Sequence, residues 1–386
     1  MQTTKTEKKT KMQPGYPAAR LVAPTVARHL AGHAEAADAR GVGALGPRPD
    51  VDTIEALIDG AFWASLQREE GRVPRISLAF IPPGGQSMVF DRPLRFQAKY
   101  LARLAPAVER PGIHLGVWPH GDELRVWGTT RLIPASTLVL EVVEPGLLVI
   151  KYKRGDEFDK FGTIAVLQGD RIMEVDEGGA SLPDCPALLS SLLGFDAPLP
   201  SKGPTSVLAQ LAVSMRAHGR GGSLILVPGG SDAWQESAAQ PIPYRVQPYA
   251  DLARLLRAED DERTRPPWRD ALHRAIETVA GLTAVDGATV LNECHEVLAF
   301  GVKLVRKRRS ERVERVVVTA PVVGDAPRIV DPGALGGTRH LSAAQFVHDQ
   351  RDALAMVASQ DGRFTVFAWS PCEDMVHAHR VEMLLM

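Results

Sequence analysis

Four short apolar runs constrain the fold of this chain more than any other feature. They form two pairs, and turn-forming residues lie between the two runs of each pair. Gly, Pro and Asp between two β-rich runs favour a tight turn, so each pair predicts a β-hairpin. Further strands are expected at 75–81 and on both sides of Gly169-Asp170. The hairpin strands are 115–118 with 123–127, around His120-Gly121-Asp122, and 137–143 with 147–153, around Glu144-Pro145-Gly146.

A helix over 52–69 is expected before these strands. Asp52 is followed three residues later by Glu55, which is the spacing of a capping box, and apolar residues then recur at helical intervals. Residues 50–196 therefore predict a mixed α+β domain with antiparallel hairpins, and its last element is a helix over 187–193. A domain boundary is expected in the stretch 196–204, which contains Pro, Ser and Gly.

Residues 1–48 are too polar and too broken by Gly and Pro to bury much surface. They predict a flexible basic leader with one short helix near 20–37. Such a leader could contact nucleic acid, but a solvated tail is the simpler interpretation. The basic residues at its start are Lys5, Lys8, Lys9 and Lys11.

Residues 204–386 alternate between helical and β-rich patterns, which predicts an α/β domain with a mixed central sheet. The segment 232–266 is charged and irregular, so an insertion is expected there. No internal repeat is detectable along the chain. Helices are expected at 205–217, 268–280 and 339–351, and strands at 223–227, 288–291, 297–303, 312–319, 353–358 and 364–369.

The charge balance bears on partners and location. With 45 Lys and Arg against 46 Asp and Glu, the net charge is -1, which argues against nucleic acid or an anionic membrane as a partner. No apolar run is long enough to cross a bilayer. The three cysteines, Cys185, Cys294 and Cys372, are far apart, which favours a reducing compartment. We therefore expect a cytoplasmic protein without a membrane contact.

Asp286-Gly287-Ala288 opens one of the expected strands of the second half. A carboxylate at a strand entrance can bind a divalent metal ion or orient a ribose hydroxyl. Gly287 permits the close approach of a ligand or of a second backbone segment. Taken alone, the tripeptide fits an ordinary Asp-Gly turn better.

Gly336-Gly337-Thr338-Arg339-His340 leads into the expected helix at 339–351. Backbone N–H groups, a hydroxyl and two basic side chains would then meet at one helix N-terminus, which favours phosphate. Arg339 can hold phosphate oxygens with two hydrogen bonds, and His340 can donate one or become charged. The alternative is a Gly-rich loop in which Thr338 is an ordinary helix cap.

Three other segments carry groups that could bind ligands. Arg306-Lys307-Arg308-Arg309, in an expected hairpin turn, could bind phosphate or nucleic acid, but no aromatic residues interleave for base stacking, so a solvated turn is favoured. His377 and His379 would share one face of a strand, but no carboxylate or cysteine pattern beside them supports a metal site. The loop 228–231 follows a strand and could border a ligand or be a plain loop.

The order of these motifs resembles the diadenylate cyclase domain family. That family has a Gly-Ala-Leu-Ile-Val-like strand, a His-Asp-Gly-Ala hairpin whose second strand ends in Ala-Gly, a Gly-Thr-Arg-His-Arg-Ala-Ala segment and an apolar strand ending in Ser-Glu-Glu. The corresponding segments follow the same order over most of 205–370. They are Gly222–Val227, Val285–Ala288 with Ala299-Phe300-Gly301, Gly337–Ala344 and Asp352–Gly362.

The resemblance implies a nucleotide site and a reaction. In that family, two ATP-loaded domains face each other and make cyclic di-AMP with a divalent metal ion. By resemblance, Asp286 would be the catalytic residue and would serve Mg²⁺ or Mn²⁺ and the attacking hydroxyl. The remaining nucleotide contacts would come from Gly287, Ala288, Gly337, Thr338, Arg339, His340 and Ser359.

Three substitutions within these motifs separate binding from catalysis. Where the family has His, Arg and Glu, this chain has Val285, Leu341 and Gln360. Because phosphoryl transfer depends on positioning and charge neutralisation, such losses can remove turnover and leave binding. Together with segments 61–66 and 127–130, the pattern resembles the variant cyclase-like domains named DACNV, described as probable sensors in bacterial signalling or conflict systems.

We therefore expect a sensor or signalling protein that binds ATP or a cyclic dinucleotide and has an impaired cyclase-like domain. One alternative is an active diadenylate cyclase or related nucleotidyltransferase, in which Asp286 and Asp361 share the metal. Another is a scaffold without a ligand. The partners implied are a purine nucleotide, a second copy of the chain and an effector protein.

Overall fold

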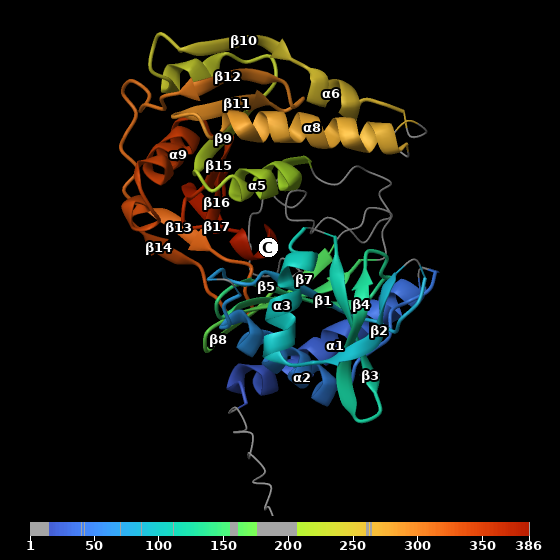
Figure 1. Cartoon of the computed structure of the whole chain (residues 1–386). Coiled ribbons are helices and arrows are strands. Elements are labelled where there is room, and N and C mark those ends of the chain that lie inside the picture. The colour runs from blue at the N-terminus through green and yellow to red at the C-terminus, as the bar shows by residue number, and fades with distance from the viewer. Residues whose placement is uncertain are drawn as a thin grey trace, which may run out of the picture. The chain divides into compact units, whose positions relative to one another are not determined.

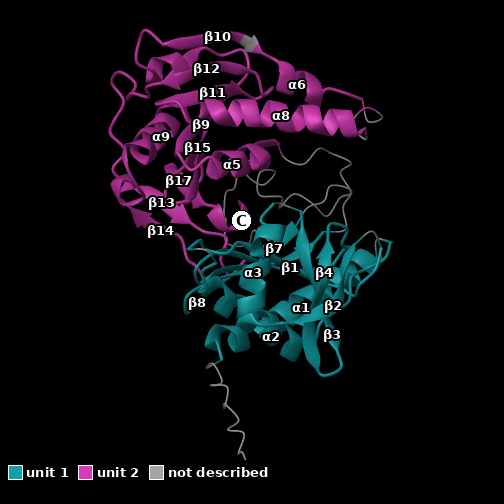
Figure 2. Cartoon of the chain, viewed as in Figure 1, with its two compact units in different colours: residues 1–174 teal, residues 175–386 magenta. Residues whose placement is uncertain are grey.

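The computed structural model describes residues 15–39, 41, 43–69, 71–85, 87–110, 112–154, 161–175, 207–259, 262 and 265–385. The chain divides into two compact units, unit 1 at 1–174 and unit 2 at 175–386 (Figure 2). Each unit combines helices with a sheet of parallel and antiparallel strands, as the sequence predicts. The helix expected at 187–193 and the boundary expected at 196–204 lie outside the described residues.

Unit 1 is an α+β fold with one eight-stranded sheet (Figure 1). The strands lie in the order β2-β4-β3-β1-β5-β6-β7-β8, and the pair β1 and β3 is parallel while the other neighbours are antiparallel. Both predicted hairpins form. The elements are α1 (Pro17–Ala39), α2 (Val51–Ser65), β1 (Ile76–Phe80), β2 (Met88–Arg95), α3 (Ala98–Val108), β3 (His114–His120), β4 (Glu123–Thr130), β5 (Leu138–Glu144), β6 (Leu147–Lys153), β7 (Phe161–Gln168) and β8 (Arg171–Glu174).

Helix α2 connects the capping signal of the sequence to the core of unit 1. Its N-cap is Asp50, whose carboxylate accepts a hydrogen bond from the Thr53 N–H at 2.7 Å, so the cap lies two residues before the predicted one. Ile54 and Ile58, one turn apart, are buried in the cluster that contains Leu78 of β1. The helical spacing of apolar residues therefore places one face of α2 on the sheet.

The predicted flexible leader is structured over its described part, which corrects that expectation. Residues 17–39 form the 23-residue helix α1, and Val22, Val26 and Leu30 are buried in the core of unit 1. Their four-residue spacing gives the Ala-rich helix an apolar stripe, which the high Ala, Gly and Pro content of the segment conceals. Tyr16 also stacks on Phe62, with 3.7 Å between ring centroids.

Unit 2 is an α/β fold around a nine-stranded mixed sheet (Figure 1). The strand order is β10-β12-β11-β9-β15-β16-β17-β13-β14, with β9–β11 and β13–β17 as parallel pairs. The elements are α5 (Val207–Ala217), β9 (Gly222–Val227), η1 (Ala233–Ser237), β10 (Tyr244–Tyr249), α6 (Asp251–Leu256), α8 (Pro266–Leu282), β11 (Ala288–Asn292), β12 (Val297–Val302), β13 (Val316–Thr319), β14 (Arg328–Val330), η2 (Pro332–Ala334), α9 (Thr338–Asp349), β15 (Leu354–Ala358), β16 (Phe364–Ser370), β17 (Met375–Arg380) and η3 (Glu382–Leu385).

Strand pairing decides two segments of unit 2, and the hairpin turn expected at 306–309 is wrong. In the segment 232–266, β10 pairs with β12 and the side chains of Trp234, Ile242 and Leu252 are buried, so the described part belongs to the core, while its origin as an insertion stays a prediction. The basic residues 306–309 do not close a hairpin, because β13 pairs with β14 and β17 instead of β12. In both cases, the pairing depends on distant strands that local patterns do not specify.

Helices cover both faces of the sheet in unit 2. Successive strand residues point to opposite faces, and Leu224 and Ile225 of β9 accordingly belong to two different core clusters. The Leu224 cluster contains α5 and α8, whereas the Ile225 cluster contains Phe346 and Val347 of α9 (Figure 1). Helix α9 therefore packs alone on its face among the α-helices of the described residues.

The two units share a strand order that the sequence does not reveal. Seven strands of each unit, numbered along the chain, lie in the spatial order 2-4-3-1-5-6-7, and only the first and third pair in parallel. These strands are β1–β7 in unit 1 and β9–β12 with β15–β17 in unit 2. The connection between the fourth and fifth strands differs, since it spans 131–137 in unit 1 and 303–353, including α9, in unit 2.

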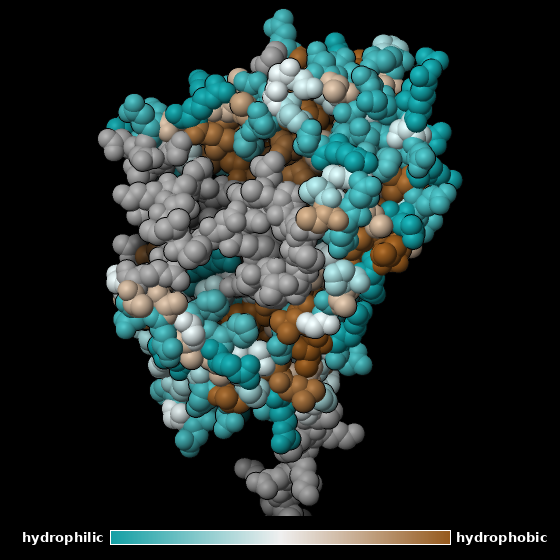
Figure 3. Space-filling view, turned by 180° about the vertical axis from the view of Figure 1, so that it is seen from behind, coloured by the Kyte–Doolittle hydropathy of each residue, from teal (hydrophilic) through white to brown (hydrophobic). Residues whose placement is uncertain are grey.

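None of the helices in the described residues is long and apolar enough to cross a bilayer. On the face drawn in Figure 3, the coloured atoms are largely hydrophilic, and the hydrophobic ones lie in separate groups. The exposed surface of this face is therefore mainly polar where it is coloured.

Burial of His379 on β17 predicts that acid destabilises unit 2. The side chain is 0% exposed, and its Nδ1 lies 2.7 Å from the Thr319 hydroxyl. Burial, together with the neighbouring His377, lowers the pKa of His379 from 6.5 to about 3. The unfolded chain therefore binds a proton below pH 6.5 that the folded chain does not bind above about pH 3, and stability falls as the pH drops through this window.

We expect His379 to remove about 2 kcal/mol of unfolding free energy between neutral pH and about pH 5, since one pKa unit corresponds to ~1.4 kcal/mol. Urea unfolding at both pH values measures this loss. It should shrink in His379→Gln and persist in His273→Gln, whose side chain on α8 is 67% exposed. An equal loss in wild type and His379→Gln would contradict the assignment.

Candidate functional site

A cavity of about 550 Å³ opens at one edge of the unit 2 sheet, where β9 and β11 begin and β12 and β15 end. These ends meet because β9 and β11 are parallel to each other and antiparallel to β15 and β12. The volume falls in the range of small-molecule sites. All eight residues that the sequence predicts for the site line the cavity: Asp286, Gly287, Ala288, Gly337, Thr338, Arg339, His340 and Ser359.

The N-terminus of α9 points its first turn at this cavity. Gly337 is the N-cap, and no side chain accepts a hydrogen bond there, so Thr338 is the first helical residue and not the cap. The N–H groups of the first turn thus lack a capping side chain, which leaves donors and the positive end of the helix dipole at the cavity. The interpretation of Thr338 as an ordinary cap is therefore wrong.

His340 forms a buried polar wall of the cavity. It is 3% exposed, and its Nε2 has no hydrogen-bond partner among the described residues. Burial lowers the pKa of His340, so its imidazole is neutral at pH 7. Gly336 packs directly on the ring, because a Cβ at this position would lie 2.5 Å from Nδ1 of His340. A neutral imidazole with a free nitrogen can exchange one hydrogen bond with a ligand.

Two cationic side chains and one carboxylate line the cavity. Neither Arg339 nor Lys303 forms an ion pair within the described residues, and the carboxylate is that of Asp286, which lies exposed at the rim. Asp361, the second metal ligand of the cyclase alternative, does not line the cavity and pairs with Arg363 at 3.3 Å. The cavity therefore has a cationic excess that suits an anionic ligand.

Asp286 is the lining residue that fits a divalent metal ion. Mg²⁺ is commonly held by one or two carboxylates together with substrate phosphates, and an exposed carboxylate beside a phosphate site meets that requirement. No group of three or more His, Cys, Asp or Glu side chains among the described residues could hold a metal ion by itself. A metal at this site would therefore arrive with the phosphates of its ligand.

Gly287 lines the cavity and also allows two backbone segments to pack closely. Its φ is +106°, and a Cβ here would lie 2.4 Å from the carbonyl carbon of Gly301 on β12. The close approach that the sequence predicts at Gly287 is thus to a second backbone segment. Gly301 itself has a φ of +64° and packs against Tyr244. Both glycines allow β11 and β12 to close together beside Asp286.

Sequence reasoning missed Lys303, Ser223 and Ser342, which also line the cavity. Lys303 follows β12 directly, two residues after the glycine of the Ala299-Phe300-Gly301 segment, and this position at a strand end is the one signal that could have identified it. Ser342 lies one helical turn after Thr338, and its hydroxyl donates to the Thr338 carbonyl at 2.6 Å. Ser223 carries no sequence signal of its own.

The other candidate segments lie away from the cavity. The loop 228–231 follows the carboxyl end of β9, whereas the cavity is at the amino end of that strand. His377 and His379 occupy one face of β17, as predicted, but His377 Nε2 lies 3.0 Å from Glu373 Oε2 and His379 contacts Thr319. The basic residues 306–309 do not line the cavity either.

Comparison with known proteins gives one family match. Residues 44–131 match the family described as "Probable sensor domain DACNV". A search among curated proteins found no match. The matched segment runs from before α2 to the end of β4, and it contains both N-terminal stretches, 61–66 and 127–130, that resemble these domains in the sequence.

The DACNV segment lies in unit 1 and covers less than a quarter of the chain, and it includes none of the cavity residues. The match suggests a role in sensing or signalling. The relation of unit 2 to the diadenylate cyclases stays a prediction, because it depends on the motifs in 205–370 alone.

Gly287→Ala should destabilise the protein strongly. A side chain at a φ of +106° costs about 1–2 kcal/mol, and the contact with Gly301 adds about 1–3 kcal/mol of overpacking. Gly230→Ala is the matched control, because its φ is +72° but no atom lies within 4 Å of the added Cβ. Urea unfolding of both variants compares the two costs, and equal destabilisation would contradict the close contact.

Proposed function

We propose that unit 2 binds a purine nucleotide, either ATP or a cyclic dinucleotide, and that the chain is a cytoplasmic sensor or signalling protein. One observation supports this most directly: the first turn of α9 has no capping side chain, and Arg339, Lys303 and His340 surround the same cavity. Phosphates are the anions that best match N–H donors combined with guanidinium and ammonium groups.

Each part of the ligand has a counterpart in the cavity. The phosphates lie at the N–H groups of Thr338 and Arg339, within reach of the guanidinium of Arg339. The ribose hydroxyls face Asp286, whose carboxylate accepts hydrogen bonds. The base lies against the apolar part of the lining, which consists of Ala288, Val302, Leu304, Val357 and Ala358. Most small-molecule sites combine an apolar wall with a few polar groups in this way.

Binding without cyclisation is the better supported form of this proposal. Gln360 lines the cavity where the cyclase family has a carboxylate, and the Asp361 carboxylate is paired with Arg363. Among the described residues that line this cavity, Asp286 is thus the one that offers a carboxylate to a metal ion and an attacking hydroxyl. Catalysis requires several groups positioned together, whereas binding tolerates the loss of one or two of them.

The sensor role derives from unit 1. Its residues 44–131 match a family described as a probable sensor domain, and unit 2 supplies the ligand site in this proposal. The effector protein, the second copy of the chain and the Mg²⁺ or Mn²⁺ ion that the sequence implies stay predictions.

Nucleotide binding is testable by calorimetry of the full chain with ATP, ADP and cyclic di-AMP. We expect at least one of them to bind, and Arg339→Ala to weaken that binding about tenfold or more, because a charged hydrogen-bond donor to phosphate is lost. Arg274→Ala, an exposed arginine on α8, is the control and should leave affinity unchanged. Absence of binding to all three nucleotides would refute the proposal.

Turnover is tested separately. Incubation with ATP and Mn²⁺ followed by chromatography should yield no cyclic di-AMP. Formation of that product in wild type, and its loss in Asp286→Asn, would establish the active cyclase in place of a binding-only domain.

A further inference from the structure

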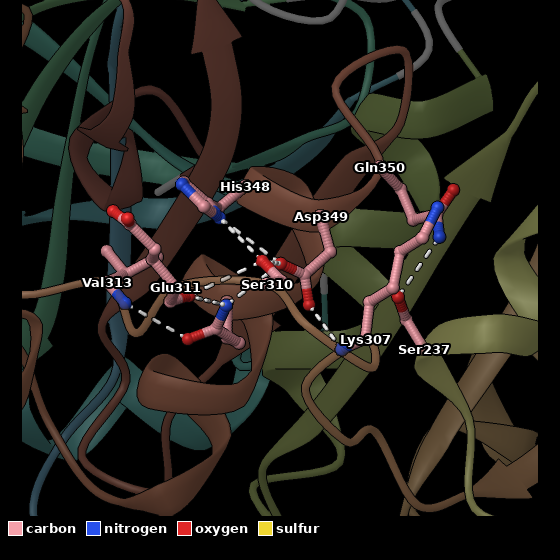
Figure 4. Close-up of polar contacts among 9 residues, drawn as sticks. Ser237, Lys307, Ser310, Glu311, Val313, His348, Asp349 and Gln350 are labelled. Carbon is pink, nitrogen blue, oxygen red and sulfur yellow. Dashed lines mark hydrogen bonds and ion pairs between the residues drawn. The ribbon is translucent and has the colours of Figure 1, made fainter.

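Asp349, the last residue of α9, holds the basic loop formed by residues 306–315 in a fixed conformation (Figure 4). Its side chain is 0% exposed. One carboxylate oxygen, Oδ2, accepts the Lys307 N–H at 2.7 Å, and the other, Oδ1, accepts hydrogen bonds from the Ser310 hydroxyl and from the Gln345 amide. A buried carboxylate is costly unless its hydrogen bonds are made, so these contacts tie the loop firmly to the helix.

The same loop is held at three further points. Gln345 accepts the Val313 N–H at 3.0 Å and donates to the Glu311 carbonyl at 2.9 Å. The Lys307 ammonium pairs with Glu236 at 2.8 Å. Arg309 adopts a φ of +70°, which is uncommon for a residue with a side chain. A backbone that is held in this conformation by a buried acid is ordered before any partner arrives.

Ser310, His348 and Asp349 do not form a hydrolytic triad. The Ser310 hydroxyl lies 3.5 Å and the Asp349 carboxylate 3.2 Å from one and the same atom, Nδ1 of His348 (Figure 4). A triad requires the serine and the acid to contact opposite nitrogens of the imidazole. The cluster therefore orders the loop and does not activate a nucleophile.

Five arginines project from this loop and from the segment that follows it. All five are exposed, and none forms a hydrogen bond or ion pair through its side chain within the described residues. Residues 306–315, named the arginine loop below, hold six cationic side chains against two glutamates, a net charge of +4 in a chain of net charge -1. The five arginines are Arg306, Arg308, Arg309, Arg312 and Arg315.

We propose that the arginine loop binds the phosphates of a nucleic-acid duplex without reading its sequence. Arginine outnumbers lysine five to one here, and the guanidinium fork matches phosphate oxygens better than an ammonium does. The arginines spread over ten residues of the chain, and none of them lines the cavity described above, so they suit a row of phosphates better than one small anion.

The absence of aromatic residues from 306–315 favours a duplex over a single strand as the ligand. Proteins that hold single strands stack the bases on aromatic side chains, and this loop offers none. A duplex presents its phosphates outside and needs no stacking partner. The loop lies at the C-terminal end of the 12-residue α9, about 17 Å along the helix from the cavity. Duplex binding thus uses a surface distinct from the nucleotide site and does not depend on it.

Fluorescence anisotropy of the full chain with a labelled 20-base-pair DNA duplex of mixed sequence tests the proposal. We expect a Kd of about 10⁻⁶ to 10⁻⁴ M near physiological salt, with a log–log salt slope no steeper than about -4.5, since five arginines contribute ~0.9 each. Arg308→Ala/Arg312→Ala should weaken binding and make the slope shallower by about 2. Arg269→Ala/Arg274→Ala, which removes two exposed arginines of α8, is the charge-matched control.

Asp349→Asn tests whether duplex binding needs the ordered loop or only the charge of its arginines. The substitution removes one negative charge from the protein, so attraction alone predicts tighter binding, whereas loss of the anchor predicts weaker binding at unchanged arginine content. Circular dichroism and thermal melting establish whether this variant folds, and the arginine variants decide the proposal if it does not.

Four results would overturn the proposal. They are no binding to the duplex at 50 mM salt, equal binding by wild type and Arg308→Ala/Arg312→Ala, tighter binding to a single strand of the same length, and binding to vesicles of phosphatidylserine and phosphatidylcholine in place of the duplex. The last result would assign the arginine loop to an anionic membrane.

Discussion

The packing of α9 on the sheet of unit 2 is the contact on which both candidate surfaces depend. Phe346 and Val347 are fully buried against the strands, and this burial fixes the direction of the helix axis. With the axis fixed, the first turn meets the cavity and the last residue, Asp349, meets the arginine loop. Apolar burial of a few side chains therefore positions donors at one end and a buried acid at the other, although the two ends share no contact.

The cavity was predictable where its residues carry local signals. Gly337 to His340 precede a helical pattern, and Asp286 precedes a strand, so the family order of motifs was enough to group them. Lys303 has only its position at a strand end as a signal and Ser223 has none of its own, because both reach the cavity through strand pairing. Likewise, Trp234 lies in a charged segment, and only the pairing of β10 with β12 shows that this segment belongs to the core.

The positive charge of the cavity and its neutral imidazole come from different side chains. Burial lowers the pKa of His340, so the positive charge of the cavity comes from Arg339 and Lys303. The site thus presents one neutral imidazole nitrogen beside two cationic side chains. Fold prediction from the sequence succeeded for hairpins and long helices. The helix expected near 20–37 forms as α1, but its burial in the core was missed because alanine hides the apolar stripe of Val22, Val26 and Leu30.

The shared strand order identifies the connection between the fourth and fifth strands as the part of the fold that can vary in length. Both units keep the same seven strands, and what distinguishes them most is the length of one connection, which is short at 131–137 and long at 303–353. The long connection carries Lys303, the arginine loop and α9, and it returns to the same strand neighbour as the short one. The seven strands thus keep one order whether this connection is short or long, so the long connection can carry binding surfaces without altering the strand order of the sheet.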